Sequence, residues 1–199
     1  MREGLKELGI SFTEEQIASF SAYLAELKKW SRVHNLTGLK EDRDIIIKHF
    51  LDSLLFLRVF PDDARSMADV GSGAGFPGIP LKIMRPELDV FLIEPSEKKC
   101  VFLRHMKALL GLKGLYVLTG RVEDIRELKV DAAVSRALFR ISDFVEKAGH
   151  ILRENGLFIL NKGPKLEEEM RGIDLQRVEV SDIRLPFGNA VRRMVTIKN

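Results

Sequence analysis

A glycine-rich stretch, Ala68-Asp-Val-Gly-Ser-Gly-Ala-Gly-Phe-Pro-Gly78, constrains the fold of this chain more than any other feature. A short apolar segment precedes the glycines, and residues with helical character follow them up to Met84. Glycine is needed there because the backbone must turn sharply with positive φ and must let a ligand approach without Cβ atoms in the way. The free amides of a first helical turn then point at that ligand. The stretch therefore predicts a strand, a tight turn and a helix, in which the turn binds a ligand or, as the alternative, is only structural.

Two classes of ligand fit the spacing of these glycines. Residues 73–78 match the dinucleotide fingerprint Gly-x-Gly-x-x-Gly, and Glu94 follows about 20 residues later, where an acidic side chain binds a ribose hydroxyl. Residues 69–75 read Asp-x-Gly-x-Gly-x-Gly, which resembles motif I of class I S-adenosylmethionine (AdoMet) methyltransferases. That resemblance implies that the glycines pass under the methionine part of AdoMet and that Glu94 holds the ribose.

Strands and helices alternate after residue 66, which is the pattern of a parallel sheet covered by helices on both faces. The expected strands are Met67–Val70, Val90–Ile93, Tyr116–Leu118, Ala132–Val134 and Leu157–Leu160, and the expected helices lie at about 77–84, 96–110, 122–127 and 140–152. Two strand-like runs at Arg177–Ile183 and Arg192–Ile197 then predict a hairpin. Five parallel strands plus an antiparallel hairpin is the α/β, Rossmann-like topology of class I methyltransferases. A dinucleotide dehydrogenase would need a second half and a catalytic domain, for which too little chain remains.

The N-terminal third predicts helices. Thr13-Glu-Glu-Gln16 has the spacing of a capping box, and apolar residues then recur at three- and four-residue intervals as far as His34. A second helix is expected from Asp42 or Asp44 to about Val59. We interpret residues 1–65 as a helical extension that packs on an AdoMet-binding methyltransferase domain at 66–199.

Composition excludes several classes of protein. No apolar run approaches the roughly 20 residues of a membrane span, and the N-terminus lacks the apolar core of a signal peptide, so we expect a cytoplasmic protein. We expect it to be a monomer. The single cysteine, Cys100, excludes an internal disulfide and a cysteine-based metal cluster, and no metal site is expected. The net charge is +3, and residues 67–199 carry 22 Lys/Arg against 18 Asp/Glu, an excess that permits nucleic-acid binding without establishing it.

Ligands of an open doubly wound sheet bind outside the carboxyl ends of the strands, so the residues just past each strand are candidates. Val122 and Glu123 follow the third strand, at the position that resembles the adenine-binding site of class I methyltransferases; Asp124 could serve by a one-residue shift. A plain helix N-terminus is the alternative there. Arg136 follows the fourth strand and Lys162 the fifth.

The residues after the fourth strand restrict the chemistry. The Asn/Asp-Pro-Pro-aromatic motif of enzymes that methylate exocyclic amines is absent, and Cys100 lies on the wrong helix for cytosine-C5 methylation. Arg136 suits a nucleophile that has no proton to lose, such as N7 of guanine, where catalysis depends on in-line positioning and desolvation. Because the N7 and O6 edge of guanine pairs well with Arg or Lys, Arg136 or Lys162 is expected to read O6 as a catalytic residue. The alternative is that Arg136 forms an ion pair with Glu94, Glu123 or the cofactor carboxylate.

Two further groups of side chains are candidates. His49, Asp52 and Ser53 lie on one short helix, where neighbouring side chains diverge by about 100°, so a hydrolase triad is geometrically poor. We expect a cap over the cofactor pocket or a packing role instead. Two groups of basic residues are candidates for contact with RNA, and the alternative is that they are solvated surface. One is the Arg192–Arg193 pair. The other is a basic face of the 96–110 helix that consists of Lys98, Lys99, Arg104, His105 and Lys107.

Six motifs occur in order along nearly the whole chain: His34-Asn-Leu-Thr37, His49-Phe-Leu-Asp-Ser-Leu54, Asp69-Val-Gly-Ser-Gly-Ala-Gly-Phe-Pro-Gly-Ile-Pro-Leu81, Lys98-Lys-x-x-Phe-Leu103, Ser135-Arg-Ala137 and Lys162-Gly163. Together they resemble the glucose-inhibited division protein B family, the small-subunit (16S) ribosomal RNA guanine-N7 methyltransferases. The Gly-Phe-Pro-Gly-Ile-Pro extension is far more specific than the glycines themselves.

The resemblance implies an AdoMet-dependent enzyme that methylates one guanine of the 530 loop, with 16S ribosomal RNA or the small ribosomal subunit as its partner. The cofactor contacts carried over from the family are Gly71, Phe76, Val122, Glu123 and Arg136; Gly73, Gly75 and Glu94 join them through motif I. The sequence departs from the family at Pro95, where Ser or Ala often follows the acidic residue. An NAD-dependent oxidoreductase and a non-catalytic RNA-binding module with a vestigial fold remain alternatives.

Overall fold

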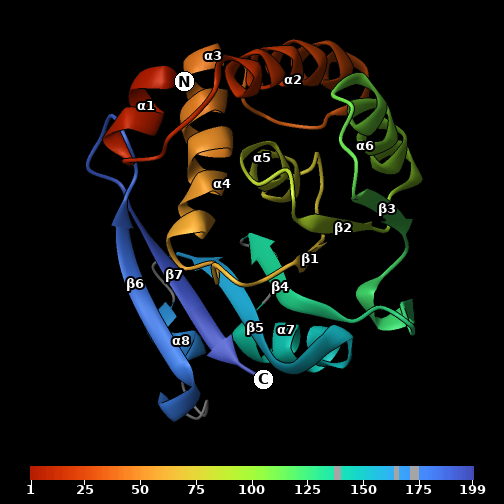
Figure 1. The fold of residues 1–199 in the computed structure, drawn as a ribbon, viewed down its shortest axis with the longest axis vertical. Helices are drawn as coiled ribbons and strands as arrows, with labels where there is room; N and C mark the ends of the chain where they lie inside the picture. Colours follow the sequence, from red (N-terminus) through yellow and green to blue (C-terminus); the bar gives the residue numbers. More distant parts are fainter. Residues whose placement is uncertain (137–139, 164–165, 171–174) are drawn as a thin grey trace.

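The computed structural model describes residues 1–136, 140–163, 166–170 and 175–199 (Figure 1). Ala137 of the Ser135–Ala137 motif lies outside these residues. Within them, seven strands form one sheet in the order β3-β2-β1-β4-β5-β7-β6. Their bounds are Ser66–Val70 (β1), Asp89–Glu94 (β2), Leu115–Thr119 (β3), Val130–Arg136 (β4), Leu152–Lys162 (β5), Val178–Arg184 (β6) and Val191–Lys198 (β7).

The pairing of the strands confirms the predicted fold class. Strands β1 to β5 run parallel, whereas β7 pairs antiparallel with both β5 and β6. In this register Lys162, at the end of β5, lies opposite Arg193, near the start of β7. The antiparallel hairpin therefore brings its basic residues to the edge of the sheet where the parallel strands end.

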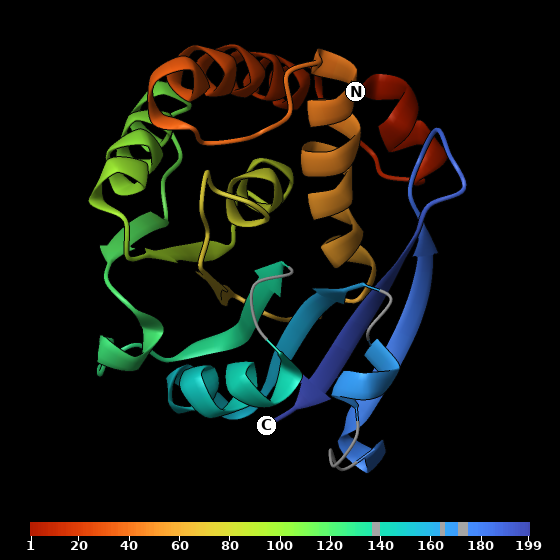
Figure 2. The ribbon, with the colours of Figure 1, turned by 180° about the vertical axis from the view of Figure 1, so that it is seen from behind.

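Side chains alternate between the two faces along each buried strand, so both faces of the sheet are apolar and both are covered by helices. Ala68, Ile93 and Ala133 face a core with α7 (Ile141–Ala148), whereas their neighbours Met67, Leu92 and Val134 face the opposite core. That second core includes α2 (Glu14–His34), α5 (Gly78–Met84) and α6 (Glu97–Leu109). Figure 1 shows α2 and α5 above the strands and α7 below them, and Figure 2 shows the same layers from behind.

The N-terminal helices are built largely as their sequence predicts. The capping box of α2 is present, since Thr13 N donates to Gln16 Oε1 at 2.8 Å and Gln16 N to Thr13 Oγ1 at 3.2 Å. Residues 42–58 form a continuous helical run whose pitch varies. It comprises α3 (Asp42–Ile45), the π-helical η1 (Ile46–Leu51), α4 (Asp52–Leu54) and the 3₁₀-helical η2 (Leu55–Arg58). The division of the chain at residue 65 remains a prediction, although these helices share one core with α5 and α6.

Two local expectations are wrong, and three short elements had no prediction. The helix expected at 122–127 is a single 3₁₀ turn, η3 (Val122–Asp124), because Ile125 is extended and turns the chain toward β4. The helix expected at 140–152 ends at Ala148, and a 3₁₀ turn, η4 (Gly149–Ile151), leads into β5. The short elements α1 (Arg2–Glu7), α8 (Leu166–Glu169) and η5 (Leu175–Arg177) were not expected. No helix of the described residues is both long and apolar enough to cross a membrane.

Candidate functional site

The loop between β1 and α5 (residues 71–77) is fixed by contacts to both of its sides. Gly73 N donates to Glu94 Oε2 at 2.9 Å, and Gly78 N donates to Asp69 Oδ2 at 2.8 Å. Tyr23 of α2, which is fully buried, donates its hydroxyl to Ala74 O at 2.5 Å. The glycine loop is thus held from the sheet, from its own helix and from the N-terminal extension.

The glycines of this loop meet different surroundings. A Cβ atom at Gly75 (φ +97°) would lie 2.5 Å from Ile79 Cδ1, so close packing requires glycine there. A Cβ atom at Gly73 (φ +59°) would meet no heavy atom closer than Gly71 O at 3.9 Å. The backbone at Gly73 is therefore open to the approach of a ligand.

A pocket of about 270 Å³ lies at the carboxyl ends of β1, β2 and β3. We call it the glycine-loop pocket, and it is lined by Val70, Gly71, Ile93, Pro95, Gly120, Arg121, Val122, Glu123 and Lys147. The structure thus brings together the predicted Gly71, Val122 and Glu123. Glu123 Oε1 lies 2.5 Å from Lys147 Nζ, and this hydrogen bond lowers the pKa of Glu123.

Glu94 lies at the end of β2, beside this pocket. Its carboxylate is buried and accepts hydrogen bonds from Gly73 N at 2.9 Å and Ser96 N at 3.0 Å, with Lys99 Nζ 3.7 Å away. Sequence reasoning placed Glu94 correctly at the strand end, but Pro95 rather than Glu94 is among the residues that line the pocket.

Two buried polar atoms near the glycine loop lack a hydrogen-bond partner among the described residues: Asp69 Oδ1 and Ser72 Oγ. Burial raises the pKa of Asp69 from 3.8 to about 7, although the hydrogen bond from Gly78 N opposes the shift. Buried polar groups in proteins are normally paired, so orphaned atoms call for an explanation. Neither Asp69 nor Ser72 is among the residues that line the glycine-loop pocket, so the fit of AdoMet to the loop depends on Gly71, which lines the pocket, and on the open backbone at Gly73.

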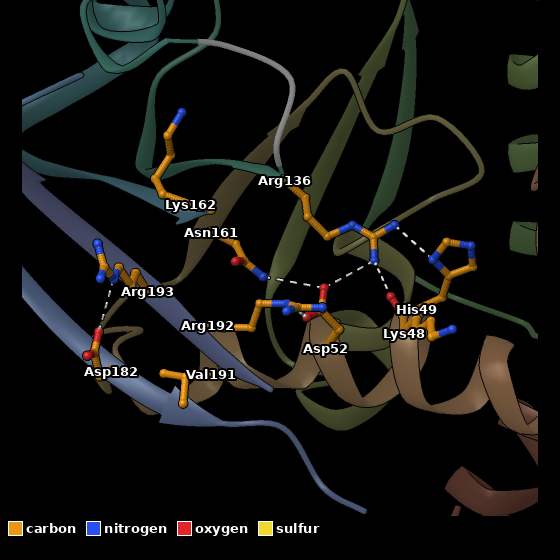
Figure 3. Close-up of a pocket in the computed structure, with 11 residues that line it drawn as sticks. Lys48, His49, Asp52, Arg136, Asn161, Lys162, Asp182, Val191, Arg192 and Arg193 are labelled. Carbon is orange, nitrogen blue, oxygen red and sulfur yellow. Dashed lines mark hydrogen bonds and ion pairs between the residues drawn. The ribbon is translucent and has the colours of Figure 1, made fainter. Parts of the chain in front are cut away.

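A second pocket, of about 670 Å³, lies at the carboxyl ends of β4 and β5 (Figure 3). We call it the basic pocket; its lining residues are Lys48, His49, Asp52, Arg136, Asn161, Lys162, Gly163, Asp182, Val191, Arg192 and Arg193. The 42–58 helical run forms one of its walls, and the hairpin strands form another (Figure 3). The cations outnumber the carboxylates in this lining, so the pocket favours an anionic ligand.

Arg136 has protein partners other than Glu94 and Glu123 among the described residues. Its Nη1 donates to Lys48 O at 3.0 Å and lies 3.4 Å from Asp52 Oδ2, and its Nη2 donates to His49 Nδ1 at 3.1 Å. The alternative of an ion pair with Glu94 or Glu123 is therefore wrong, because both carboxylates are held by other groups near their own strand ends. The N-terminal extension supplies the partner instead.

Phe76 of the glycine loop links the loop to the wall of the basic pocket. The guanidinium carbon of Arg136 lies 5.1 Å from the centroid of the Phe76 ring, and the His49 ring stacks on that ring at 4.6 Å. Burial, assisted by Arg136, lowers the pKa of His49 from 6.5 to about 4, so the imidazole is neutral at pH 7. A hydrolase triad is excluded because Ser53 Oγ donates to the His49 backbone oxygen at 2.6 Å.

The remaining basic candidates are partly engaged within the protein. Lys162 is buried and its Nζ lies 2.5 Å from Glu169 Oε2, and Arg193 pairs with Glu167. Figure 3 shows the Lys162 side chain directed away from Arg136 and Asp52. On α6, Arg104 pairs with Glu97, His105 with Glu26 and Lys99 with Glu94, while Lys107 lies over the Tyr116 ring. The role of Lys162 on a base remains a prediction.

Sequence reasoning did not foresee the part that Lys147 and Asp52 play in these pockets. Lys147 enters the glycine-loop pocket from α7, on a face that gave no motif. Asp52 was expected only in a cap or a packing role, yet it is buried and bound by side chains from three strands. A charged residue inside the apolar run from Phe50 to Phe56 was the available signal, since buried carboxylates need partners.

Known proteins resemble this chain in sequence and in fold. The family model described as rRNA small subunit methyltransferase G matches residues 16–193. A protein of Methylobacillus flagellatus named "Ribosomal RNA small subunit methyltransferase G" is 39% identical over 98% of this chain and 95% of its own length. A methyltransferase from Pyrococcus furiosus (TM-score 0.63, 15% identity, 91% of this chain and 98% of that chain) shares the fold. So does a SAM-dependent methyltransferase from Aquifex aeolicus (TM-score 0.59, 20% identity, 85% and 97%). The chain therefore belongs to the rRNA small subunit methyltransferase G family.

Proposed function

We propose that this protein transfers the methyl group of AdoMet to N7 of a guanine in the 530 loop of 16S ribosomal RNA. Membership of the family makes it an AdoMet-dependent methyltransferase of small-subunit rRNA, which removes the oxidoreductase alternative. The atom, the loop, a monomeric state and a cytoplasmic location are our additions. The observation that carries the choice of atom is a basic pocket whose only buried carboxylate, among the described residues, is already held by two arginines.

The cofactor fits the glycine-loop pocket. AdoMet supplies a methyl group on a sulfonium centre. Glu94 would hold the ribose, and Val122 and Glu123 would bind the adenine. Gly71, which lines the pocket, and the open backbone at Gly73 would take the methionine part. Close packing at Gly75 keeps the loop in shape. Phe76 of the same loop contacts Arg136, and this contact extends the cofactor site toward the basic pocket.

The polar groups of the basic pocket suit a nucleophile without a proton. His49 is neutral and hydrogen-bonded at both ring nitrogens, to Arg136 and to Thr37 Oγ1 at 2.7 Å. Asp52 is occupied by Arg136 and Arg192. Neither group is available as a general base, and guanine N7 needs none because its lone pair attacks directly. Arg136 can donate to O6 on the same edge of the base, and Lys162 is the second candidate for that contact.

Mass spectrometry tests the atom and the base together. Small ribosomal subunits and naked 16S rRNA, both lacking the modification, would be incubated with the protein and isotope-labelled AdoMet and then digested to nucleosides. We expect labelled 7-methylguanosine, and a labelled fragment that maps to the 530 loop. Label on another base or atom would refute the proposal.

Calorimetry tests the choice of cofactor, and light scattering tests the monomeric state. S-adenosylhomocysteine should bind, whereas NADH should not. RNA binding without any affinity for S-adenosylhomocysteine would support the non-catalytic RNA-binding module instead. Light scattering on a sizing column should give the mass of one chain, 22.6 kDa.

A further inference from the structure

Asp52 is the meeting point of four elements at the basic pocket. Its Oδ1 accepts from Arg192 Nε of β7 at 2.6 Å. Its Oδ2 accepts from Asn161 Nδ2 of β5 at 3.3 Å and lies 3.4 Å from Arg136 Nη1 of β4. The carboxylate itself comes from α4, 84 residues before Arg136 in the chain. Figure 3 shows the three donors converging on this one side chain.

The burial of Asp52 makes these contacts more consequential than surface ion pairs. Its side chain is 5% exposed, whereas those of Arg136 and Arg192 are 18% and 31% exposed. A pair near bulk water contributes little, but a buried carboxylate that loses its partners is costly. Loss of either ion pair would therefore be energetically costly, which favours a structure in which both arginines stay bound to Asp52.

The shared carboxylate also decides how the two arginines lie relative to each other. Each guanidinium occupies a different oxygen of Asp52, so two like charges are held side by side on one wall of the pocket. Without the negative charge between them they would repel each other. No other described carboxylate of the pocket can replace it, because Asp182 is 63% exposed and lies near Arg193.

We propose that Asp52 is a positioning residue for methyl transfer: it holds Arg136 and Arg192 together in the arrangement in which they orient the target nucleotide. This inference rests on the proposed function of the basic pocket. It also assigns the N-terminal extension a part in the reaction, since the extension supplies the residue that sets the geometry of two side chains from the sheet. Arg136 touches the base in this scheme, and Asp52 acts only through the two arginines.

The test is a comparison of Asp52→Asn with wild type, in which kcat and KM for the rRNA substrate are measured separately. Asp52→Asn removes one negative charge from the pocket, so electrostatics alone would tighten RNA binding and leave KM equal or lower. A positioning role predicts that kcat nevertheless falls at least tenfold. Asp42→Asn is the matched control: it removes the same charge from the same helical run, where the side chain is exposed and pairs with Lys28. That control should retain the wild-type kcat.

A double-mutant cycle separates positioning from support of the fold. If Asp52 acts in part through Arg136, Asp52→Asn should lower kcat by a clearly smaller factor in the Arg136→Ala background than in wild type, and the effect that remains is the part that acts through Arg192. The affinity for S-adenosylhomocysteine, which binds in the other pocket, should stay within twofold of wild type. Arg192→Lys keeps the positive charge but removes the Nε donor, so it should also lower kcat, without raising KM.

Three outcomes would overturn the inference. They are a wild-type kcat in Asp52→Asn, an undiminished effect of Asp52→Asn in the Arg136→Ala background, and a joint loss of S-adenosylhomocysteine binding and thermal stability. A wild-type protein that methylates no rRNA would overturn the proposed function instead, so the two failures are distinct.

Discussion

The buried carboxyl group of Asp69 should make the folded protein less stable as pH rises. Burial raises its pKa from 3.8 to about 7. Between these values the folded protein keeps a proton that the unfolded chain has lost, so the free energy of unfolding falls with increasing pH. One pKa unit corresponds to about 1.4 kcal/mol. The full shift therefore amounts to about 4 kcal/mol, lost between about pH 4 and pH 7.

His49 contributes in the opposite direction. Burial lowers its pKa from 6.5 to about 4. Between these values the unfolded chain binds a proton that the folded protein does not, so the stability rises with pH over that window. The two contributions largely cancel below pH 6.5, and the contribution of Asp69 must therefore be isolated with a variant.

The Asp69→Asn variant isolates the contribution of Asp69 to the pH dependence of stability. Asn keeps the shape of the side chain and an oxygen that can accept from Gly78 N. Urea unfolding of both proteins at pH 5, 6, 7 and 8 gives the difference in the free energy of unfolding, variant minus wild type. We expect this difference to grow by about 1.4 kcal/mol per pH unit up to about pH 7 and then to level off. A difference that stays constant from pH 5 to pH 8 would refute the reasoning.

Three other substitutions probe the pockets and the loop. Arg136→Ala should reduce methyl transfer at least tenfold and leave the fold intact, as the far-UV circular dichroism spectrum would show; near-normal turnover would remove Arg136 from the reaction. Tyr23→Phe removes the 2.5 Å hydrogen bond to Ala74 O and should cost about 1 kcal/mol in urea unfolding, whereas unchanged stability would contradict a role in holding the loop. Gly75→Ala should destabilise by about 1–3 kcal/mol through its positive φ and its contact with Ile79. Gly111→Ala shares the positive φ but meets nothing within 4 Å, so it should cost less, and equal losses would show that packing is irrelevant at Gly75.

The sheet was predictable because each parallel strand has a recognisable local sequence pattern. Buried parallel strands such as β1 and β2 are short apolar runs between turn residues, and α2 carries both a capping box and an apolar stripe. The 3₁₀ turn at Val122–Asp124 was not predictable, since residues 122–127 have ordinary helical composition and the position of β4 decides their course. Tertiary context overrides propensity in so short a segment.

The candidate site was predictable only as a set of positions. The rule that ligands bind at strand ends located Gly71, Val122, Glu123, Arg136 and Lys162 correctly at the carboxyl edge of the sheet. The strand-end rule could not predict which charged side chains pair. Arg136 and Asp52 are 84 residues apart in the chain, and only the packing of the N-terminal helices brings them together. Long-range pairing of this kind leaves no periodicity in the sequence.

The glutamates of α8 affect how binding at the basic pocket responds to salt. Glu169 pairs with Lys162, and Glu167 pairs with Arg193. A polyanion that engages these two cations must first detach a carboxylate from each and return it to water, and a cation that stays paired with its glutamate displaces no counterion condensed on the polyanion. Because the salt dependence of nucleic-acid affinity follows the number of counterions released, its slope should be shallower than a count of lysines and arginines around the pocket suggests.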